Sequence, residues 1–92
     1  MDFEWDAKKA VSNLRKHCVS FADAARMFLD PNRIESFNVR DAYGEDRWKT
    51  VDLVEPALLT VVYTIRGNDG DITRLISARK ADAYERAQYR KV

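Results

Sequence analysis

The stretch LLTVVYTIRGNDGDITRLISAR, residues 58–79, decides the fold of this chain. Residues 58–65 form a run rich in β-branched side chains, which is typical of a buried central strand. Gly67-Asn68-Asp69-Gly70 favours a hairpin connection, because glycine and asparagine accept the backbone angles of a tight turn. Residues 71–78 then predict a second strand, so an antiparallel hairpin forms the centre of the fold.

Weaker strand patterns precede this hairpin. Residues 34–39 alternate weakly, and residues 47–54 read as a strand that ends at Glu55-Pro56. The polar residues 41–46 form the loop between them. At the start of the chain, MDFEWD alternates acidic with aromatic residues and predicts a short first strand.

Capping residues mark three helices. Asp6 is a suitable N-cap for a first helix, whose predicted apolar stripe consists of Ala7, Ala10, Val11, Leu14 and Cys18. Ser20 and Asp23 resemble a capping box for a second helix, which ends at Asp30-Pro31. Asp82 and Glu85 form a similar pair at the start of a C-terminal helix.

These elements predict a single α+β domain over residues 1–92. We expect an antiparallel sheet of about four strands in the order β-α-α-β-β-β-α, with two N-terminal helices and one C-terminal helix. The 92 residues leave no room for a second domain, and the 46% apolar content supports one core.

Composition excludes several classes of protein. One cysteine excludes a disulfide framework, and one histidine excludes a His-rich metal site. No metal, nucleotide or other cofactor motif is present. No apolar run approaches the length of a membrane span, and the acidic, aromatic N-terminus is unlike a signal peptide. We therefore expect a cytoplasmic protein with no membrane contact and no cofactor.

The formal net charge of +1 conceals an uneven distribution. Residues 74–92 carry six Lys and Arg against two Asp and Glu, around the junction of the last strand and last helix. Strand alternation places Arg66 on one polar face with Thr73, Ser77 and Arg79, whereas Arg74 has the wrong parity and requires an edge position or a bulge. Such a basic cluster can bind phosphates, or it can be a solvated helix end.

Individual residues leave several readings open. His17 and Cys18 are neighbours on a helix and do not face each other. Cys18 is predicted to be a packed thiol. His17 either caps the first helix, or acts as an acid or base or contacts a phosphate. Trp5 and Trp48 favour the core or its edge. Glu35 and Glu45 are candidate bases, although each is more typical of a solvated surface position.

The sequence resembles the BrnT family of ribonuclease toxins from type II toxin–antitoxin modules. The resemblance covers residues 3 to about 90 and rests on an ordered set of motifs. These are Phe3-x-Trp5-Asp6-x-x-Lys9, Asn13-x-x-Lys16-His17-x-Val19-Ser20-Phe21, Asp30-Pro31, Gly44-Glu45-Asp46-Arg47-Trp48, Val62-Tyr63-Thr64-x-Arg66 and Arg74-x-Ile76-Ser77-Ala78-Arg79-Lys80-Ala81.

The resemblance implies a RelE-like fold and RNA cleavage without a metal ion, which halts translation. RNA supplies its own nucleophile, the 2′-hydroxyl, so the protein need only orient it, remove a proton and stabilise the charged transition state. The resemblance implies a BrnA-like antitoxin with a ribbon-helix-helix end as the partner, assembled with the toxin in a 2:2 complex. Operator DNA is then contacted only through the antitoxin. We expect the antitoxin to cover the face that carries Arg66 and Arg79.

The resemblance also implies roles for particular residues. Arg66 and Arg79 would bind the scissile phosphate, and Glu35 or His17 would act as the general base. The expected RNA-binding residues are Lys9, Arg47 and Tyr89, to which the basic junction adds Lys80.

The chain departs from the family pattern at Cys18, where a glycine is usual. Glycine accepts the left-handed conformation that ends many helices, so cysteine predicts either a different helix end or a strain of about 1 kcal/mol. The tail is also less basic, with Asp82 and Ala83 at positions that are often basic. These departures motivate an alternative function, a catalytically weak member that acts with its antitoxin as a co-repressor module.

Overall fold

The computed structural model describes residues 2–40, 44–54 and 57–90. The elements along the chain are β1 (Asp2–Glu4), α1 (Ala7–His17), α2 (Phe21–Ala24), the 3₁₀ helix η1 (Ala25–Leu29), β2 (Ile34–Arg40), β3 (Asp46–Val54), β4 (Ala57–Arg66), β5 (Ile72–Lys80) and α3 (Ala83–Arg90). The predicted α+β class is confirmed, and the elements follow the expected order except that four strands, not three, lie between α2 and α3. The expected strand end at Glu55-Pro56 and most of the loop after residue 40 lie outside the described residues.

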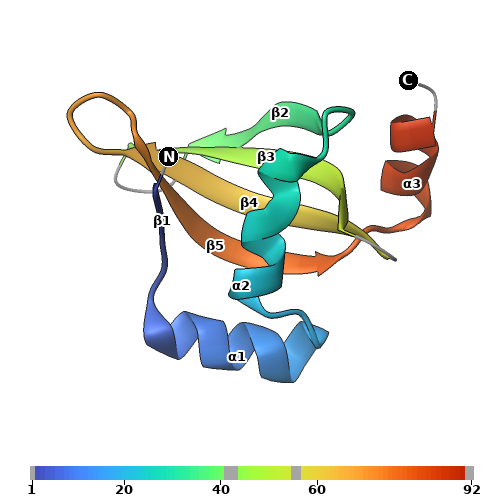
Figure 1. The fold of residues 1–92 in the computed structure, drawn as a ribbon, viewed down its shortest axis with the longest axis horizontal. Coiled ribbons are helices and arrows are strands. Elements are labelled where there is room, and N and C mark those ends of the chain that lie inside the picture. The colour runs from blue at the N-terminus through green and yellow to red at the C-terminus, as the bar shows by residue number, and fades with distance from the viewer. Residues whose placement is uncertain (1, 41–43, 55–56, 91–92) are drawn as a thin grey trace.

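The five strands form one sheet in the order β1-β5-β4-β3-β2, so the predicted central strand is indeed central (Figure 1). Strands β2 to β5 pair antiparallel, whereas β1 pairs parallel with β5. The sheet therefore has five strands, one more than the expected four, and the short strand that was predicted at the start of the chain lies at its edge. Helices α1 and α2 carry the chain from this edge to the opposite one.

A bulge in β5 decides which residues share a face of the sheet. The pairing of β4 with β5 shifts by one residue at Ile76, which has no partner on β4. Before the bulge, Thr73 turns into the core and is 1% exposed, contrary to its expected place on the polar face. Arg74 instead lies opposite Thr64, on the polar face. The bulge thus accounts for the parity of Arg74.

One face of the sheet packs against α1 and α2. Phe21 and Ala24 of α2 lie against the central hairpin, and the core cluster includes Val61, Tyr63 and Leu75. The aromatic residues Trp5 and Trp48 lie at the edge of this core, as expected.

The predicted caps are confirmed. The Asp6 carboxylate accepts hydrogen bonds from the backbone N–H groups of Lys8 and Lys9, at 2.8 and 3.1 Å. Ser20 Oγ accepts from the Asp23 N–H at 3.1 Å. The second helix nevertheless stays α-helical only over Phe21–Ala24 and continues as η1 up to Leu29.

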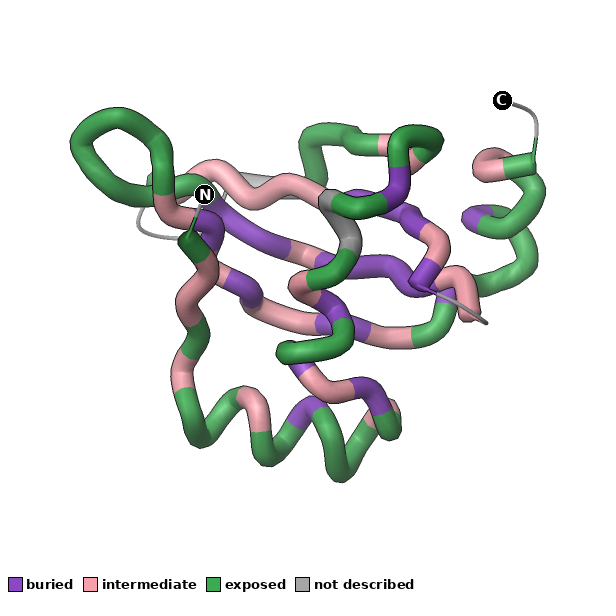
Figure 2. The backbone as a smooth tube through the Cα atoms, viewed as in Figure 1, coloured by how far each residue is buried: buried purple, intermediate pink, exposed green. Residues whose placement is uncertain are grey.

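Helix α1 is rotated away from the orientation that its apolar stripe predicts. Its one buried residue is Asn13, whereas Val11 and Leu14 are 55% and 52% exposed (Figure 2). Asn13 Nδ2 donates to the carbonyls of Val19 and Ala78, and Asn13 Oδ1 accepts from the Ala78 N–H, at 2.8–3.0 Å.

This rotation has a physical cause. Strand β1 pairs with β5 only over residues 72–74, so the outer edge of β5 beyond them needs other hydrogen-bond partners. The Asn13 amide supplies both a donor and an acceptor to Ala78, as a neighbouring strand would. Satisfying this edge turns Asn13 inward and the apolar stripe outward.

No helix within the described residues is long and apolar enough to cross a membrane.

Candidate functional site

Five basic side chains lie on the sheet face opposite α1 and α2. Residues that pair directly across strands share a face. The pairs Thr60–Arg79, Val62–Ser77, Thr64–Arg74 and Lys49–Val62 therefore place Lys49, Arg74 and Arg79 together. Strand alternation adds Arg47 and Arg66 to the same face. We call this surface the arginine face: Arg47, Lys49, Arg66, Arg74 and Arg79.

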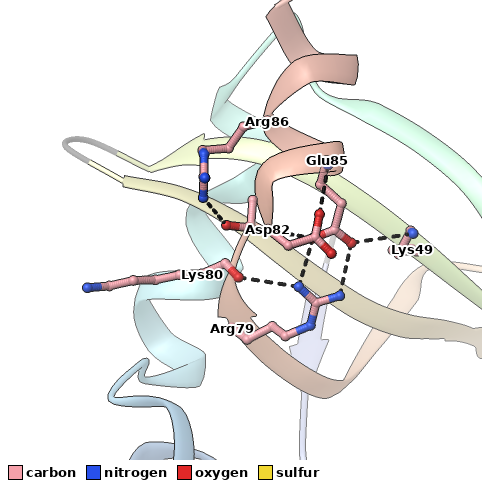
Figure 3. Close-up of polar contacts among 7 residues, drawn as sticks. Lys49, Arg79, Lys80, Asp82, Glu85 and Arg86 are labelled. Atoms are coloured by element: carbon pink, nitrogen blue, oxygen red, sulfur yellow. Dashed lines mark hydrogen bonds and ion pairs between the residues drawn. The ribbon is translucent and has the colours of Figure 1, made fainter.

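Arg79 is held by a buried carboxylate from α3 (Figure 3). Glu85 is 4% exposed and accepts hydrogen bonds from both terminal nitrogens of Arg79, at 2.7 and 2.9 Å. Lys49 Nζ lies 3.4 Å from Glu85 Oε2. The carboxylate thereby brings two cations from β3 and β5 to one point and fixes the direction of the guanidinium.

Glu85 also closes the predicted capping box. The Glu85 N–H donates to Asp82 Oδ1 at 2.8 Å, and the Asp82 N–H donates to Glu85 Oε1 at 2.9 Å. Burial would raise the pKa of Glu85, but the hydrogen bonds from Arg79 and from Asp82 outweigh it and lower that pKa to about 2. The carboxylate is therefore ionised throughout the neutral range.

Arg66 and Arg79 lie at opposite ends of the arginine face. Arg79 pairs with Thr60, and Arg66 is six positions farther along β4. At the rise of a β-strand this separation is about 20 Å. Arg66 is instead bound to Glu45 at 2.7 Å, and Arg74 forms an ion pair with Glu4. The structure therefore does not bring Arg66 and Arg79 together around one phosphate.

A basic groove runs between α1 and the bulged part of β5. It has a volume of about 210 Å³, and its walls include Lys9, Lys16 and His17 from α1 and Ile76 and Ser77 from β5. Ser77 also belongs to the sheet face that carries Arg79. The groove, which we call the edge groove, therefore adjoins the arginine face at Ser77.

Cys18 preserves the helix end beside this groove. Its backbone is left-handed, with φ 58° and ψ 29°, and its N–H donates to the Leu14 carbonyl. This is the conformation that a glycine would supply. The thiol is exposed, so the prediction of a packed cysteine is wrong. The chain accepts backbone strain at Cys18, and the helix still presents His17 to the groove.

Glu35 lies on the other face of the sheet. It pairs with Thr50, whose partner Val61 belongs to the core. Tyr63 Oη donates to Glu35 at 2.6 Å, and Arg33 forms an ion pair with it. Burial opposes ionisation, but these two donors hold the pKa of Glu35 below its ordinary value. The sheet separates Glu35 from Arg79, so the two residues do not form one catalytic site.

Lys80 and Tyr89 line a larger hollow between the end of the sheet and α3. Its volume is about 560 Å³, and Arg86 and Arg90 also contribute to its walls. Tyr89 Oη donates to the buried carboxylate of Asp30 at 2.7 Å, which ties α3 to the end of η1. The hydroxyl of Tyr89 is thus occupied by a structural contact, while Lys80 is exposed.

Sequence reasoning missed Lys49 and Asn13. A signal was present for Lys49, because its parity matches that of Arg47 along the strand. For Asn13 the signal was its place at the start of a family motif, since a buried amide breaks the apolar periodicity and gives no pattern of its own. Among the described residues, no group of three or more His, Cys, Asp or Glu side chains is placed to hold a metal ion.

Comparison with known proteins gives two results that agree. Residues 5–85 match the family described as "Ribonuclease toxin, BrnT, of type II toxin-antitoxin system". The fold is similar to the 1.1 Å crystal structure of the Brucella abortus ribonuclease toxin BrnT, with a TM-score of 0.67 and 25% sequence identity over 89% of this chain and 97% of that one. A search of curated protein sequences gave no match.

Proposed function

Because the chain belongs to the BrnT family of ribonuclease toxins of type II toxin–antitoxin systems, we propose that it cleaves RNA without a metal ion and thereby inhibits translation. The observation that carries the proposal is that Ser77 lines the edge groove and also lies on the sheet face that carries Arg79. Together the two surfaces offer cations to several successive phosphates of an RNA strand, with His17 beside them.

His17 is the proposed general base. It lies in a groove whose two lysines, Lys9 and Lys16, attract the RNA backbone. The 2′-hydroxyl attacks the adjacent phosphorus and gives its proton to the His17 imidazole. The bond from phosphorus to the 5′-oxygen breaks, and that oxygen takes a proton from solvent. The products are a 2′,3′-cyclic phosphate and a free 5′-hydroxyl.

Arg79 is the proposed ligand of the charged transition state. Its two terminal nitrogens are fixed by Glu85, so the guanidinium needs no reorganisation when negative charge develops on the phosphate. Arg47 and Lys80 are proposed contacts to the rest of the RNA strand, and Tyr89 offers its ring. Arg66, about 20 Å from Arg79 along the sheet, reaches a different phosphate.

The two flanks of α1 give a matched test of RNA cleavage. Lys9→Ala/Lys16→Ala removes two cations from the edge groove, whereas Lys8→Ala/Arg15→Ala removes two exposed cations outside it. Both double variants lose the same charge from the same helix. With purified protein, a structured RNA and EDTA, we expect the first to lose cleavage and the second to keep it.

His17→Ala tests the chemistry itself. General base catalysis contributes about 10²–10⁴-fold, so we expect a loss of that size with unchanged thermal stability. Intact RNA with wild-type protein in EDTA, together with harmless induction in cells, would instead support the co-repressor module. Equal activity of both α1 double variants would show that RNA approaches by another route.

The proposed partner is a BrnA-like antitoxin with a ribbon-helix-helix end, assembled with this chain in a 2:2 complex. Its support is the family, since type II toxins act with a protein antitoxin. Size-exclusion chromatography with light scattering on the co-expressed pair measures the stoichiometry, and a 1:1 mass would contradict it.

A further inference from the structure

A second surface of α1 has no role in the site described above. Val11 and Leu14 are 55% and 52% exposed, and the neighbouring Trp5 is 37% exposed. With Phe21 and Ala22 of α2, these three line one shallow hollow of about 250 Å³. Isolated exposed apolar residues are ordinary, but several around one hollow mark an interaction surface. We call this surface the α1 apolar hollow.

The charges beside the hollow restrict what it can bind. Helix α1 contains four Lys and Arg and no Asp or Glu. At 100° per residue, Lys8 and Arg15 lie within about 60° of Val11, on the side away from the buried Asn13. The helix therefore presents an apolar stripe with a basic border along its outer side.

A second copy of the chain fits this surface poorly, because two α1 helices would bring their basic borders together. RNA fits it poorly too, since the stripe itself offers no donors to phosphates. The complementary ligand is a protein helix with an apolar face and an acidic flank, which fills the hollow and pairs with Lys8 and Arg15.

We propose that the α1 apolar hollow is the docking site for an acidic amphipathic helix of the antitoxin. This places the antitoxin on the helix side of the sheet and not on the face that carries Arg66 and Arg79. The inference rests on the toxin–antitoxin part of the proposed function and is independent of RNA cleavage, so the two can fail separately.

The footprint of the complex tests the proposal without any substitution. The probe is the BrnA-like antitoxin of the proposed function, purified and added to the wild-type protein. Hydrogen–deuterium exchange should then show protection in residues 5–22 and less change in residues 60–66. Protection confined to the arginine face, or no binding, would overturn the proposal, whereas RNA cleavage by the free protein would still support the proposed activity.

Substitutions on the two flanks of α1 provide the second readout. Val11→Ser/Leu14→Ser changes side chains that are more than half exposed, so the fold should persist. We expect this variant to bind the antitoxin at least tenfold more weakly by calorimetry, and Lys8→Glu/Arg15→Glu to weaken binding in a salt-dependent way. Lys9→Ala/Lys16→Ala is the control, with unchanged affinity. Equal affinity of all three variants, or a dimer of the free protein that Leu14→Ser dissociates, would contradict the proposal.

Discussion

Buried carboxyl groups lie on both faces of the sheet, and two of them, Glu85 and Asp52, show opposite electrostatic results. Glu85, on the arginine face, is 4% exposed and receives hydrogen bonds from Arg79 and Asp82, which hold its pKa at about 2. Asp52, on the helix-covered face, is fully buried. Within the described residues neither oxygen of Asp52 has a hydrogen-bond partner. Burial, together with the nearby charge of Asp30, raises the pKa of Asp52 to about 7.

The comparison shows that partners, more than burial, decide the charge of a carboxyl group. Desolvation opposes ionisation at both positions, and only the fixed donors around Glu85 overcome it. The face that is proposed to bind RNA is thus locked into one charge state. The opposite face contains a group that changes its protonation near neutral pH.

Asn13 gives the largest expected effect, because it is a buried polar group that makes three hydrogen bonds to backbone groups. Asn13→Ala should lower the free energy of unfolding by about 4 kcal/mol, since it removes three hydrogen bonds and leaves groups of Ala78 and Val19 without partners. Urea unfolding followed by circular dichroism measures the change. Ser12→Ala, at an exposed neighbouring position, should stay within about 0.5 kcal/mol. A small loss for Asn13→Ala would mean that α1 does not complete the edge of β5.

Glu85→Gln should cost about 3 kcal/mol at pH 7, because it leaves Arg79 and Lys49 without their shared counter-ion. The matched control is Glu45→Gln, which breaks the more exposed pair with Arg66 and should cost less than about 1 kcal/mol. The pKa of Glu85 is lowered from 4.5 to about 2, so its stabilisation is present above pH 4.5 and is lost as the pH falls toward 2. Glu85→Gln should flatten this acid limb of the stability curve. Equal costs for the two variants would remove the distinction between the buried and the exposed pair.

Asp52 should affect the pH dependence of stability in the opposite direction to Glu85, and Asp52→Asn tests this. The pKa of Asp52 is raised from 3.8 to about 7, so between these values the folded state keeps a proton that the unfolded state has released. Stability therefore falls as the pH rises through this window. The difference in free energy of unfolding between Asp52→Asn and wild type should therefore shift by about 2 kcal/mol in favour of the variant from pH 5 to pH 7.5. Thermal unfolding at the two pH values tests this, with the exposed Asp69→Asn as control. A difference that does not depend on pH would show that Asp52 is ionised throughout.

Local patterns predicted much of this fold. The hairpin of residues 58–79, the caps at Asp6 and Asp82 and the alternation along β4 depend on neighbouring residues, and the structure agrees with all of them. The orientation of α1 could not be predicted in this way. It depends on an unpaired strand edge 65 positions away, which Asn13 satisfies.

In the candidate site, too, the features that depend on pairing between strands could not be predicted from local patterns. Parity along each strand placed Arg66 and Arg79 correctly on one face, but the distance between them follows from the register of β4 against β5. The bulge at Ile76 moved Arg74 onto that face and Thr73 off it. The face that Glu35 occupies could not be predicted either, because it is set by pairing with β3 and not by the weak alternation of its own strand.

Cys18 gives the smallest expected effect, and its origin is the backbone. It is the one residue other than glycine with positive φ among the described residues. Cys18→Gly should raise stability by about 0.5–1 kcal/mol, because glycine adopts this conformation without the steric cost of a Cβ. Cys18→Ala keeps that cost and removes only the exposed thiol, so it should leave stability nearly unchanged. Both variants should cleave RNA at the wild-type rate, since the helix end that presents His17 is already the one a glycine would form. Faster cleavage by Cys18→Gly would instead mean that the cysteine displaces His17, and would mark this chain as a weakened member of its family.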